Sequence, residues 1–341
     1  MTTRVDDDRV ARIVIDWITG SRGPVAHAVF CADPRVAHTA AALLDDTAVV
    51  LMPESAGRVE TRALVVPYSG ALDEVGDTLH VGGRSVELQH YLAAAYVELI
   101  VPTVVRFLDA DGWSAFLDDA DLARRTGVFS SAVVDPRLRL GDGAVLHAPF
   151  ATQRPGILHV HGDGQVTAGP QGGVLGEVDD LARILDTPVP RLIAFAGLSP
   201  LAALHADVAR RPWLGRYLRA AELAGLLGTR GGRRRIDGFG QSSIVDERAD
   251  ANPASDDPFL VETDDGILLA DPRTRRRQLL STEAATVVAA MQTSSTLEFA
   301  IERCRAALGI TTANARALCA EAGARLGVHV GVSATTAGAP S

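Results

Sequence analysis

Two tight-turn signals between short strand-like segments constrain the C-terminal part of the chain more than any other feature. Apolar runs lie at residues 259–262 and 267–270, and a third segment at 275–280 ends in two leucines. The turns are an Asp-Gly pair at 265–266 and an Asp-Pro pair at 271–272. Both pairs favour tight reversals, because glycine accepts a positive φ and proline fixes its own φ. The pattern therefore predicts three consecutive antiparallel strands.

Three helical segments follow the predicted strands. The first begins at Ser281, and the third ends at Gly327. In the second, Ser295 and Glu298 have the spacing of a capping box, and Gly309 ends the segment. Its apolar residues recur at the spacing of one helical face, and they are Leu297, Ile301, Cys304 and Leu308. Three strands followed by three helices predict a compact winged-helix-like module, with a final strand at 328–332.

Alternating strand and helix signals predict an α/β region before this module. The expected strands are residues 26–31, 48–52, 63–67, 78–81 and 85–88, and the expected helices are residues 34–44, 89–108 and 113–125. An α+β region follows, with a hairpin at 156–168, a helix at 175–185, a strand at 191–196 and helices within 199–227. We expect at least some of the strands to pair in parallel.

Changes in composition divide the chain into five expected regions. Residues 229–255 are rich in glycine, serine and charged residues and poor in core-forming residues, which is typical of a linker. The regions are an α/β domain at 1–130, an α+β region at 131–228, the linker at 229–255, the C-terminal module at 256–333 and a disordered tail at 334–341. The sequence leaves open whether the first two regions form one unit.

The chain contains no lysine, and all 33 of its basic residues are arginine. An arginine guanidinium stays protonated and forms no Schiff base. A lysine-linked pyridoxal site, a Walker A loop and a kinase-type catalytic lysine are therefore excluded. The sequence also contains no G-x-S-x-G motif, and we predict no catalytic residue and no cofactor.

Composition also bears on the compartment and on the class of partner. The net charge of −9 argues against a nucleic-acid partner, because phosphate contacts require an excess of basic residues. The N-terminal segment lacks the features of a signal peptide, and no apolar stretch reaches 18 residues. The three cysteines are an odd number without a CxxC motif. We expect a cytoplasmic protein that has no membrane partner.

Three other sequence patterns are of the kinds that bind metals, phosphates or acidic partners. His159, His161 and Asp163 alternate as metal ligands on a strand do, but no second ligand pair is evident, so we predict no metal site. A glycine-rich segment at 169–176 has the character of a phosphate loop or, more simply, of a turn between elements. The basic residues of the predicted linker form either a solvated surface or a contact for an acidic partner, and they are Arg230, Arg233, Arg234 and Arg235.

The string DDGILLADPRTRRRQLLSTEAATVVAAM, followed by the helix STLEFAIERCRAALG, resembles a RiPP recognition element. RiPPs are ribosomally synthesised and post-translationally modified peptides, and this element is the domain that binds the leader segment of their precursors. The small peptide chaperone of pyrroloquinoline quinone biosynthesis typifies the family. One departure is Leu280–Ser281, where the family usually has Leu-Asn. The whole chain is similar to the stand-alone recognition proteins of daptide-type pathways.

The resemblance implies a winged helix that binds a leader peptide by β-augmentation along its third strand, next to its third helix. The implied partners are the precursor peptide and its modifying enzymes, and a homodimer is left open. The residues that would contact the leader are Arg275, Arg276, Arg277, Gln278, Leu279, Leu280, Arg316, Cys319, Ala320 and Gly323.

Simpler interpretations and two alternative functions stand beside this one. Arg275–Arg277 equally suit a solvated strand edge, and Cys304 and Cys319 suit small core residues. The first alternative is a peptide-modifying enzyme with a fused leader-binding domain. The second is a winged-helix transcription regulator. Eight arginines and ten acidic residues at 256–333 give a module charge of 8 − 10 = −2, which argues against DNA binding.

Overall fold

The computed structural model describes residues 7–21, 23, 25–97, 101–228, 234–240 and 247–332. It is a mixed α/β protein that divides into two compact units. The first unit comprises residues 1–116 and 137–208, and the second comprises residues 117–136 and 209–341. The predicted boundaries at 130, 228 and 255 do not coincide with this division, because the chain leaves the first unit and then returns to it.

A ten-stranded sheet forms the centre of the first unit, in the order β11-β10-β9-β1-β2-β3-β4-β5-β6-β7. Its strands are β1 (His27–Cys31), β2 (Ala48–Pro53), β3 (Leu64–Gly70), β4 (Thr78–Val81), β5 (Arg84–His90), β6 (Thr103–Arg106), β7 (Leu138–Leu140), β9 (Ile157–Val160), β10 (Gln165–Thr167) and β11 (Val174–Glu177). Strands β9, β1, β2 and β3 pair in parallel, as do β5, β6 and β7, and the other pairs are antiparallel. The predicted parallel pairing is therefore confirmed.

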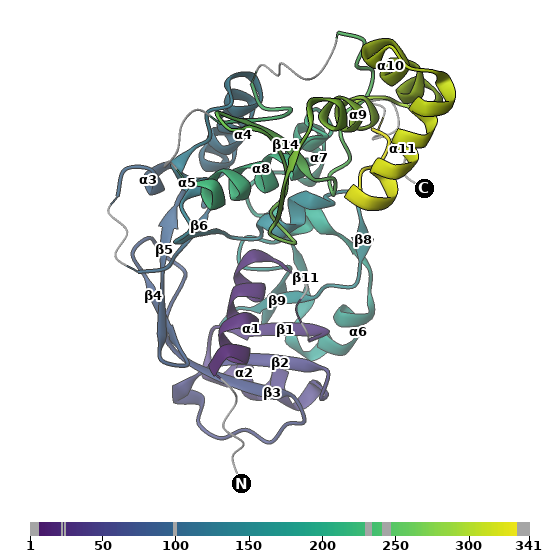
Figure 1. Cartoon of the computed structure of the whole chain (residues 1–341). Helices are drawn as coiled ribbons and strands as arrows, with labels where there is room; N and C mark the ends of the chain where they lie inside the picture. Colours follow the sequence, from purple (N-terminus) through teal and green to yellow (C-terminus); the bar gives the residue numbers. More distant parts are fainter. Residues whose placement is uncertain are drawn as a thin grey trace. The chain divides into compact units, whose positions relative to one another are not determined.

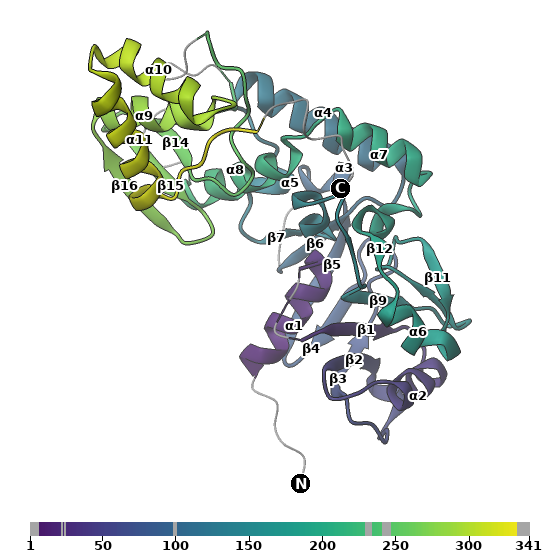
Figure 2. The same ribbon diagram turned by 90° about the vertical axis from the view of Figure 1, so that its right-hand side faces the viewer.

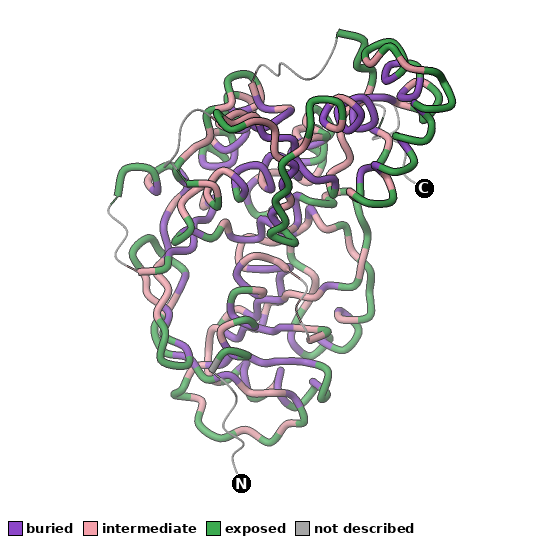
Figure 3. The backbone as a smooth tube through the Cα atoms, viewed as in Figure 1, coloured by how far each residue is buried: buried purple, intermediate pink, exposed green. Residues whose placement is uncertain are grey.

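Helices cover both faces of this sheet. Helix α1 (Asp7–Thr19) packs on one face, and α2 (Pro34–Leu43) and α6 (Leu181–Asp186) pack on the other. Figures 1 and 2 show α1 and α2 on opposite sides of the sheet. Strands β1, β2 and β9 lie between the two layers and are buried almost throughout (Figure 3). This double cover explains why these strands have continuous apolar runs rather than alternating ones.

Helix α1 was not among the predicted elements, although its sequence carries an amphipathic signal. The apolar positions recur at helical spacing and are all buried, and they are Val10, Ile13, Val14, Trp17 and Ile18. Trp17 stacks on Phe30 of β1 at a ring-centroid distance of 4.5 Å, and Phe30 stacks on Tyr68 of β3 at 4.6 Å. A ladder of three aromatic rings thus fixes α1 to the sheet.

Three predicted elements of the first unit are wrong in type. The helix expected at 89–108 is a short helix, α3 (Tyr91–Ala94), followed by strand β6, because the β-branched run after Pro102 favours extended backbone. The helix expected at 175–185 is strand β11, the 3₁₀ turn η3 (Val178–Asp180) and then α6. The strand expected at 191–196 is the 3₁₀ turn η4 (Arg191–Phe195).

Short elements complete the first unit. Strands β8 (Thr152–Gln153) and β12 (Val189–Pro190) form a separate two-stranded ladder. The 3₁₀ turns are η1 (Glu54–Ala56) and η2 (Gly143–His147), and helix α7 (Leu201–Ala209) ends the unit. Helix α4 (Ala110–Thr126) begins in the first unit and ends in the second.

The second unit combines two helices with the predicted C-terminal module. The helices are α5 (Ser131–Val134) and α8 (Leu214–Leu227). The sheet has the order β13-β14-β15-β16, with β13 (Arg235–Ile236), β14 (Phe259–Thr263), β15 (Gly266–Asp271) and β16 (Arg276–Leu280). Helices α9 (Thr282–Gln292), α10 (Leu297–Leu308) and α11 (Thr312–Leu326) follow. The predicted order of three strands and three helices is present, and β13 adds a fourth strand.

The helix ends of the C-terminal module follow local sequence signals. Ser281 caps α9 by accepting a hydrogen bond from the Ala284 amide, and left-handed Gly309 and Gly327 end α10 and α11. The predicted capping residue of α10 is wrong by one position. Thr296 caps this helix, because the amide and hydroxyl of Ser295 both donate to the Asp250 carboxylate.

The last described residues do not form the expected strand at 328–332. Only an isolated bridge joins Val332 to Asn252. The predicted tail at 334–341 lies outside the described residues. Within the part of the chain that the structure describes, no helix is both long and apolar enough to cross a membrane.

We predict that His159 makes the protein less stable in mild acid. Burial, the largest cause, acts together with His161 and Arg106 to lower the pKa of His159 to about 3. A histidine in the unfolded chain titrates near pH 6.5. Only the unfolded state therefore gains a proton as the pH falls through this range, so the free energy of unfolding falls with it. Between pH 7 and pH 5 this group should remove about 2 kcal/mol.

Denaturant titrations of His159→Phe at these two pH values test the prediction. The variant keeps a ring beside Phe30, which stacks on His159 at a centroid distance of 5.1 Å, and should lose most of the acid dependence. His80→Phe is the matched control, because His80 is exposed on β4. An equal acid dependence in His159→Phe and the unchanged protein would contradict the prediction.

Candidate peptide-binding groove

Strand β16 lies at the end of the sheet of the second unit, and among the described strands it pairs only with β15. Its first four residues are exposed, and Leu279 keeps 61% of its surface exposed. Every second residue of such an edge strand directs its N–H and C=O groups away from the sheet. Within the described residues, these groups have no neighbouring strand. The edge can therefore accept a further strand.

A groove of about 390 Å³ runs between β16 and helices α9 and α11. Arg276, Gln278 and Leu280 line one side, because alternate residues of a strand share a face. Ser281, Glu283, Ala284 and Val287 line it from the start of α9, and Leu318, Glu321, Ala322, Arg325 and Leu326 line it from α11. Figure 2 shows β16 and α11 side by side in the C-terminal part.

The groove has an apolar floor and a polar end. The floor consists of Leu280, Ala284, Val287, Leu318, Ala322 and Leu326. At the polar end, the Arg276 guanidinium donates to the Arg325 carbonyl at 3.3 Å and to Gln278 Oε1 at 3.1 Å. Arg325 forms an ion pair with Glu321 at 2.8 Å. Such a surface suits an extended peptide whose apolar side chains face inward and whose polar groups meet the arginines.

A second hollow of about 590 Å³ adjoins this end of the groove. The two share Arg276, Gln278, Arg325 and Leu326. Asp256, Asp271, Arg273 and His329 add further charge to the second hollow. The surface next to β16 therefore extends beyond the apolar groove and becomes more polar along the way.

The strand residues predicted to contact a peptide fall into three positions. Arg276, Gln278 and Leu280 line the groove. Arg277 and Leu279 lie on the opposite face, and Arg277 donates to the Leu226 carbonyl of α8 at 3.2 Å. Arg275 lies in the preceding turn with a φ of 56°, outside the strand.

The predicted residues of α11 lie away from the groove. Arg316 and Ala320 are exposed and are not among the lining residues. Cys319 is buried in the core, with its Sγ 3.7 Å from Cys304 Sγ. A Cβ on Gly323 would lie 3.5 Å from the Val328 carbonyl oxygen. The groove side of α11 is instead the row at 318, 321, 322, 325 and 326.

Two buried arginines of α8 hold the sheet that carries this groove. Arg216 donates to the Ala254, Asp257 and Pro258 carbonyls at 3.0, 2.9 and 3.3 Å. Its guanidinium lies 4.0 Å from the ring centre of Phe259, the first residue of β14. Burial lowers the pKa of Arg216, while Asp237 and Asp257 partly offset this shift, and the resulting pKa is about 10. Arg219 donates to Asp271, at the end of β15, at 3.2 Å.

The other sequence patterns are engaged in ordinary structural contacts. His159 is buried, the His161 ring bonds Thr167 Oγ1 at 3.0 Å, and Asp163 accepts from the Gln165 amide. Among the residues that the structure describes, no group of three His, Cys, Asp or Glu side chains is placed to hold a metal. The glycine-rich segment leads into strand β11 rather than directly into a helix.

The predicted basic cluster is only partly described. Arg230 and Arg233 lie outside the described residues. Arg234 donates to the Gly228 carbonyl at 2.6 Å, and Arg235 lies 3.8 Å from Glu262 across the β13–β14 ladder. Arg234 therefore contacts the end of α8, and Arg235 contacts the neighbouring strand of the sheet.

Comparisons of this chain with protein-family models, with curated proteins and with solved structures found no match.

We predict that Arg216→Met destabilises the second unit by about 3 kcal/mol, because it leaves three buried carbonyls without a donor. Denaturant unfolding followed by circular dichroism measures the change. Arg305→Met is the control, since Arg305 is an exposed residue of α10, and it should change the stability by less than about 0.5 kcal/mol. Similar effects of the two substitutions would show that the Arg216 contacts contribute little.

Proposed function

We propose that the C-terminal module is a winged-helix-like leader-binding domain. In this proposal the protein is a non-catalytic recognition protein that binds the leader of a RiPP precursor and delivers it to modifying enzymes. The observation that carries the proposal is the uncovered edge of β16 beside an apolar groove. The resemblance of residues 264–309 to a RiPP recognition element agrees with it.

Strand addition would supply the affinity. A leader laid along β16 gains main-chain hydrogen bonds to the free edge, and its alternate side chains point into the groove. Leu280, Val287 and Leu318 would receive the apolar side chains, which bury apolar surface on both partners. A recognition protein that also docks an enzyme raises the local concentration of the peptide at that enzyme.

The groove also favours a particular leader composition. Apolar residues at every second position would face the floor, and an acidic residue would lie near Arg276 and Arg325. Glu283 at the start of α9 would disfavour an acidic residue at the other end. DNA recognition fits less well, because Arg316 and Arg325 are the only basic residues of α11 and Arg325 is already paired with Glu321.

We predict that Leu318→Glu weakens leader binding at least about tenfold, because it places a charge on the apolar floor. Fluorescence anisotropy of labelled synthetic RiPP leader segments, titrated with the full-length protein, measures the affinity. Ala317→Glu is the matched control, since Ala317 is an exposed neighbour on α11 that does not line the groove. It should change the affinity by less than about twofold.

Hydrogen exchange separates strand addition from other modes of binding. A bound leader should slow the exchange of alternate amides within residues 276–280, where the edge N–H groups become hydrogen-bonded. Binding that Leu318→Glu leaves unchanged, or that leaves exchange of β16 unaffected, would count against the proposal.

A further inference from the structure

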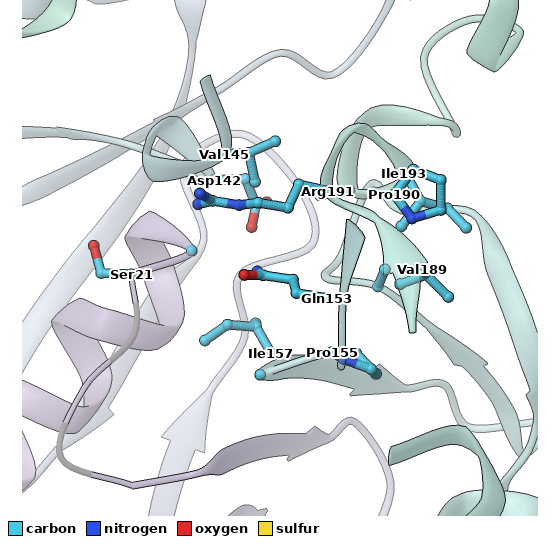
Figure 4. A pocket seen from close by; sticks show the side chains of 14 residues that line it. Ser21, Asp142, Val145, Gln153, Pro155, Ile157, Val189, Pro190, Arg191 and Ile193 are labelled. Atoms are coloured by element: carbon cyan, nitrogen blue, oxygen red, sulfur yellow. The ribbon is translucent and has the colours of Figure 1, made fainter. Parts of the chain in front are cut away.

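A small pocket lies within the first unit, far along the sequence from the C-terminal module. Its volume is about 50 Å³. The end of α1, the turn η2, strands β8 and β12, the start of β9 and the turn η4 all contribute to it. Figure 4 shows that its polar side chains include Ser21, Asp142, Gln153 and Arg191, among apolar residues such as Ile157 and Val189.

Asp142 is the distinctive residue of this pocket. It is 4% exposed, yet no described residue donates a hydrogen bond to its carboxylate. Its backbone has a left-handed φ of 54°, and its amide donates to the Ile18 carbonyl at 2.9 Å. A Cβ on Gly20 or on Gly169 would lie 3.2 Å from its Oδ1. Two glycines therefore make room for a carboxylate that faces the pocket and accepts no hydrogen bond from the part of the chain that the structure describes.

A buried carboxylate without a donor is costly, and such groups often mark sites that bind a ligand. Burial raises the pKa of Asp142 to about 7, and Arg106 acts in the opposite direction. The carboxylate would be stabilised by an N–H donor that enters the pocket. Gln153 offers an amide N–H in the same pocket and can donate to an acceptor on the entering group.

The charges around the pocket and its volume limit which chemical groups can bind in it. Arg106 acts electrostatically on Asp142, and Arg191 lines the same pocket next to it (Figure 4), so a cation is disfavoured. The charge of Asp142 itself disfavours an anion. Each water-sized group needs roughly 10–15 Å³ of such space. The pocket therefore suits a neutral group of about three to five non-hydrogen atoms. A primary carboxamide is a neutral group of this size that carries a hydrogen-bond donor and an acceptor on the same carbon atom.

We propose that this pocket binds a primary carboxamide, whose NH₂ donates to Asp142 and whose carbonyl accepts from Gln153. An asparagine or glutamine side chain and an amidated peptide end both carry this group. The proposal does not depend on leader binding, because all of its residues belong to the first unit.

Acetamide is the probe, because it has four non-hydrogen atoms and carries both hydrogen-bonding groups. We expect it to bind the full-length protein with a Kd on the order of 1–10 mM, as befits so small a ligand. Saturation-transfer NMR detects binding, and shifts of the amide resonances of Asp142 and Gly169 locate it. Acetone lacks the donor and methylammonium lacks the acceptor, so both should bind at least about tenfold more weakly.

Asp142→Asn tests the carboxylate, since asparagine tolerates a left-handed backbone. It should weaken acetamide binding about tenfold, because the charge-assisted hydrogen bond is lost. Asp179→Asn is the control at an exposed position of η3 and should bind acetamide as the unchanged protein does. Gln153→Leu removes the proposed donor without touching Asp142, and should also weaken binding.

Several results would overturn the proposal. These are no acetamide binding at 100 mM, tighter binding of methylammonium than of acetamide, or unchanged binding by both Asp142→Asn and Gln153→Leu. If Asp142→Asn fails to fold, the Gln153→Leu titration decides the question alone.

Discussion

The groove-bearing sheet depends on one buried cation, the guanidinium of Arg216. Burying a charge is costly unless polar groups replace its water. Here three backbone carbonyls do so, at Ala254, Asp257 and Pro258, and the ring of Phe259 covers one face. These contacts fix the point at which the chain enters β14. The position of β16, two strands further on, follows from that entry point.

Arg219 adds a second contact from the same helix. It lies three residues after Arg216, and residues at this spacing share one face of a helix. Arg216 donates to carbonyls that directly precede β14, and Arg219 donates to Asp271 at the end of β15. One face of α8 therefore contacts the sheet at two separated places. The opposite face of the sheet remains for α9, α10 and α11, whose packing creates the groove.

The sequence predicted the C-terminal module well because its signals are local. Ser281, Gly309 and Gly327 act within one turn of their own helices, and the hairpin turns need only neighbouring residues. The first unit was harder, because the type of an apolar segment there depends on what covers it. The β-branched residues at 103–106 favour extended backbone, and the pairing of this segment between β5 and β7 makes it a strand within a longer apolar stretch.

The candidate sites show the same limit. Leu318, Ala322 and Leu326 have the spacing of a buried helical face, and only the position of β16 makes that face one wall of a groove. A sequence pattern does not distinguish a core contact from a groove lining. The pocket at Asp142 is even harder to predict from the sequence, because its lining residues are spread from Gly20 to Ala194. The local sequence at this pocket is Asp142 between Gly141 and Gly143, and such a pattern is common in ordinary turns.

The interleaved path of the chain has a consequence for how the protein is made. Residues 117–136 belong to the second unit but leave the ribosome before residues 137–208, which complete the first. Their partner helix α8 is synthesised later still, and it packs so closely that a Cβ on Gly225 would collide with the Val134 carbonyl. Synthesis of the second unit therefore begins before the first unit is complete, and it finishes only after the first unit has been made. The early segment must remain soluble until α8 arrives, and a shortened chain that starts after residue 228 would lack Arg216 altogether.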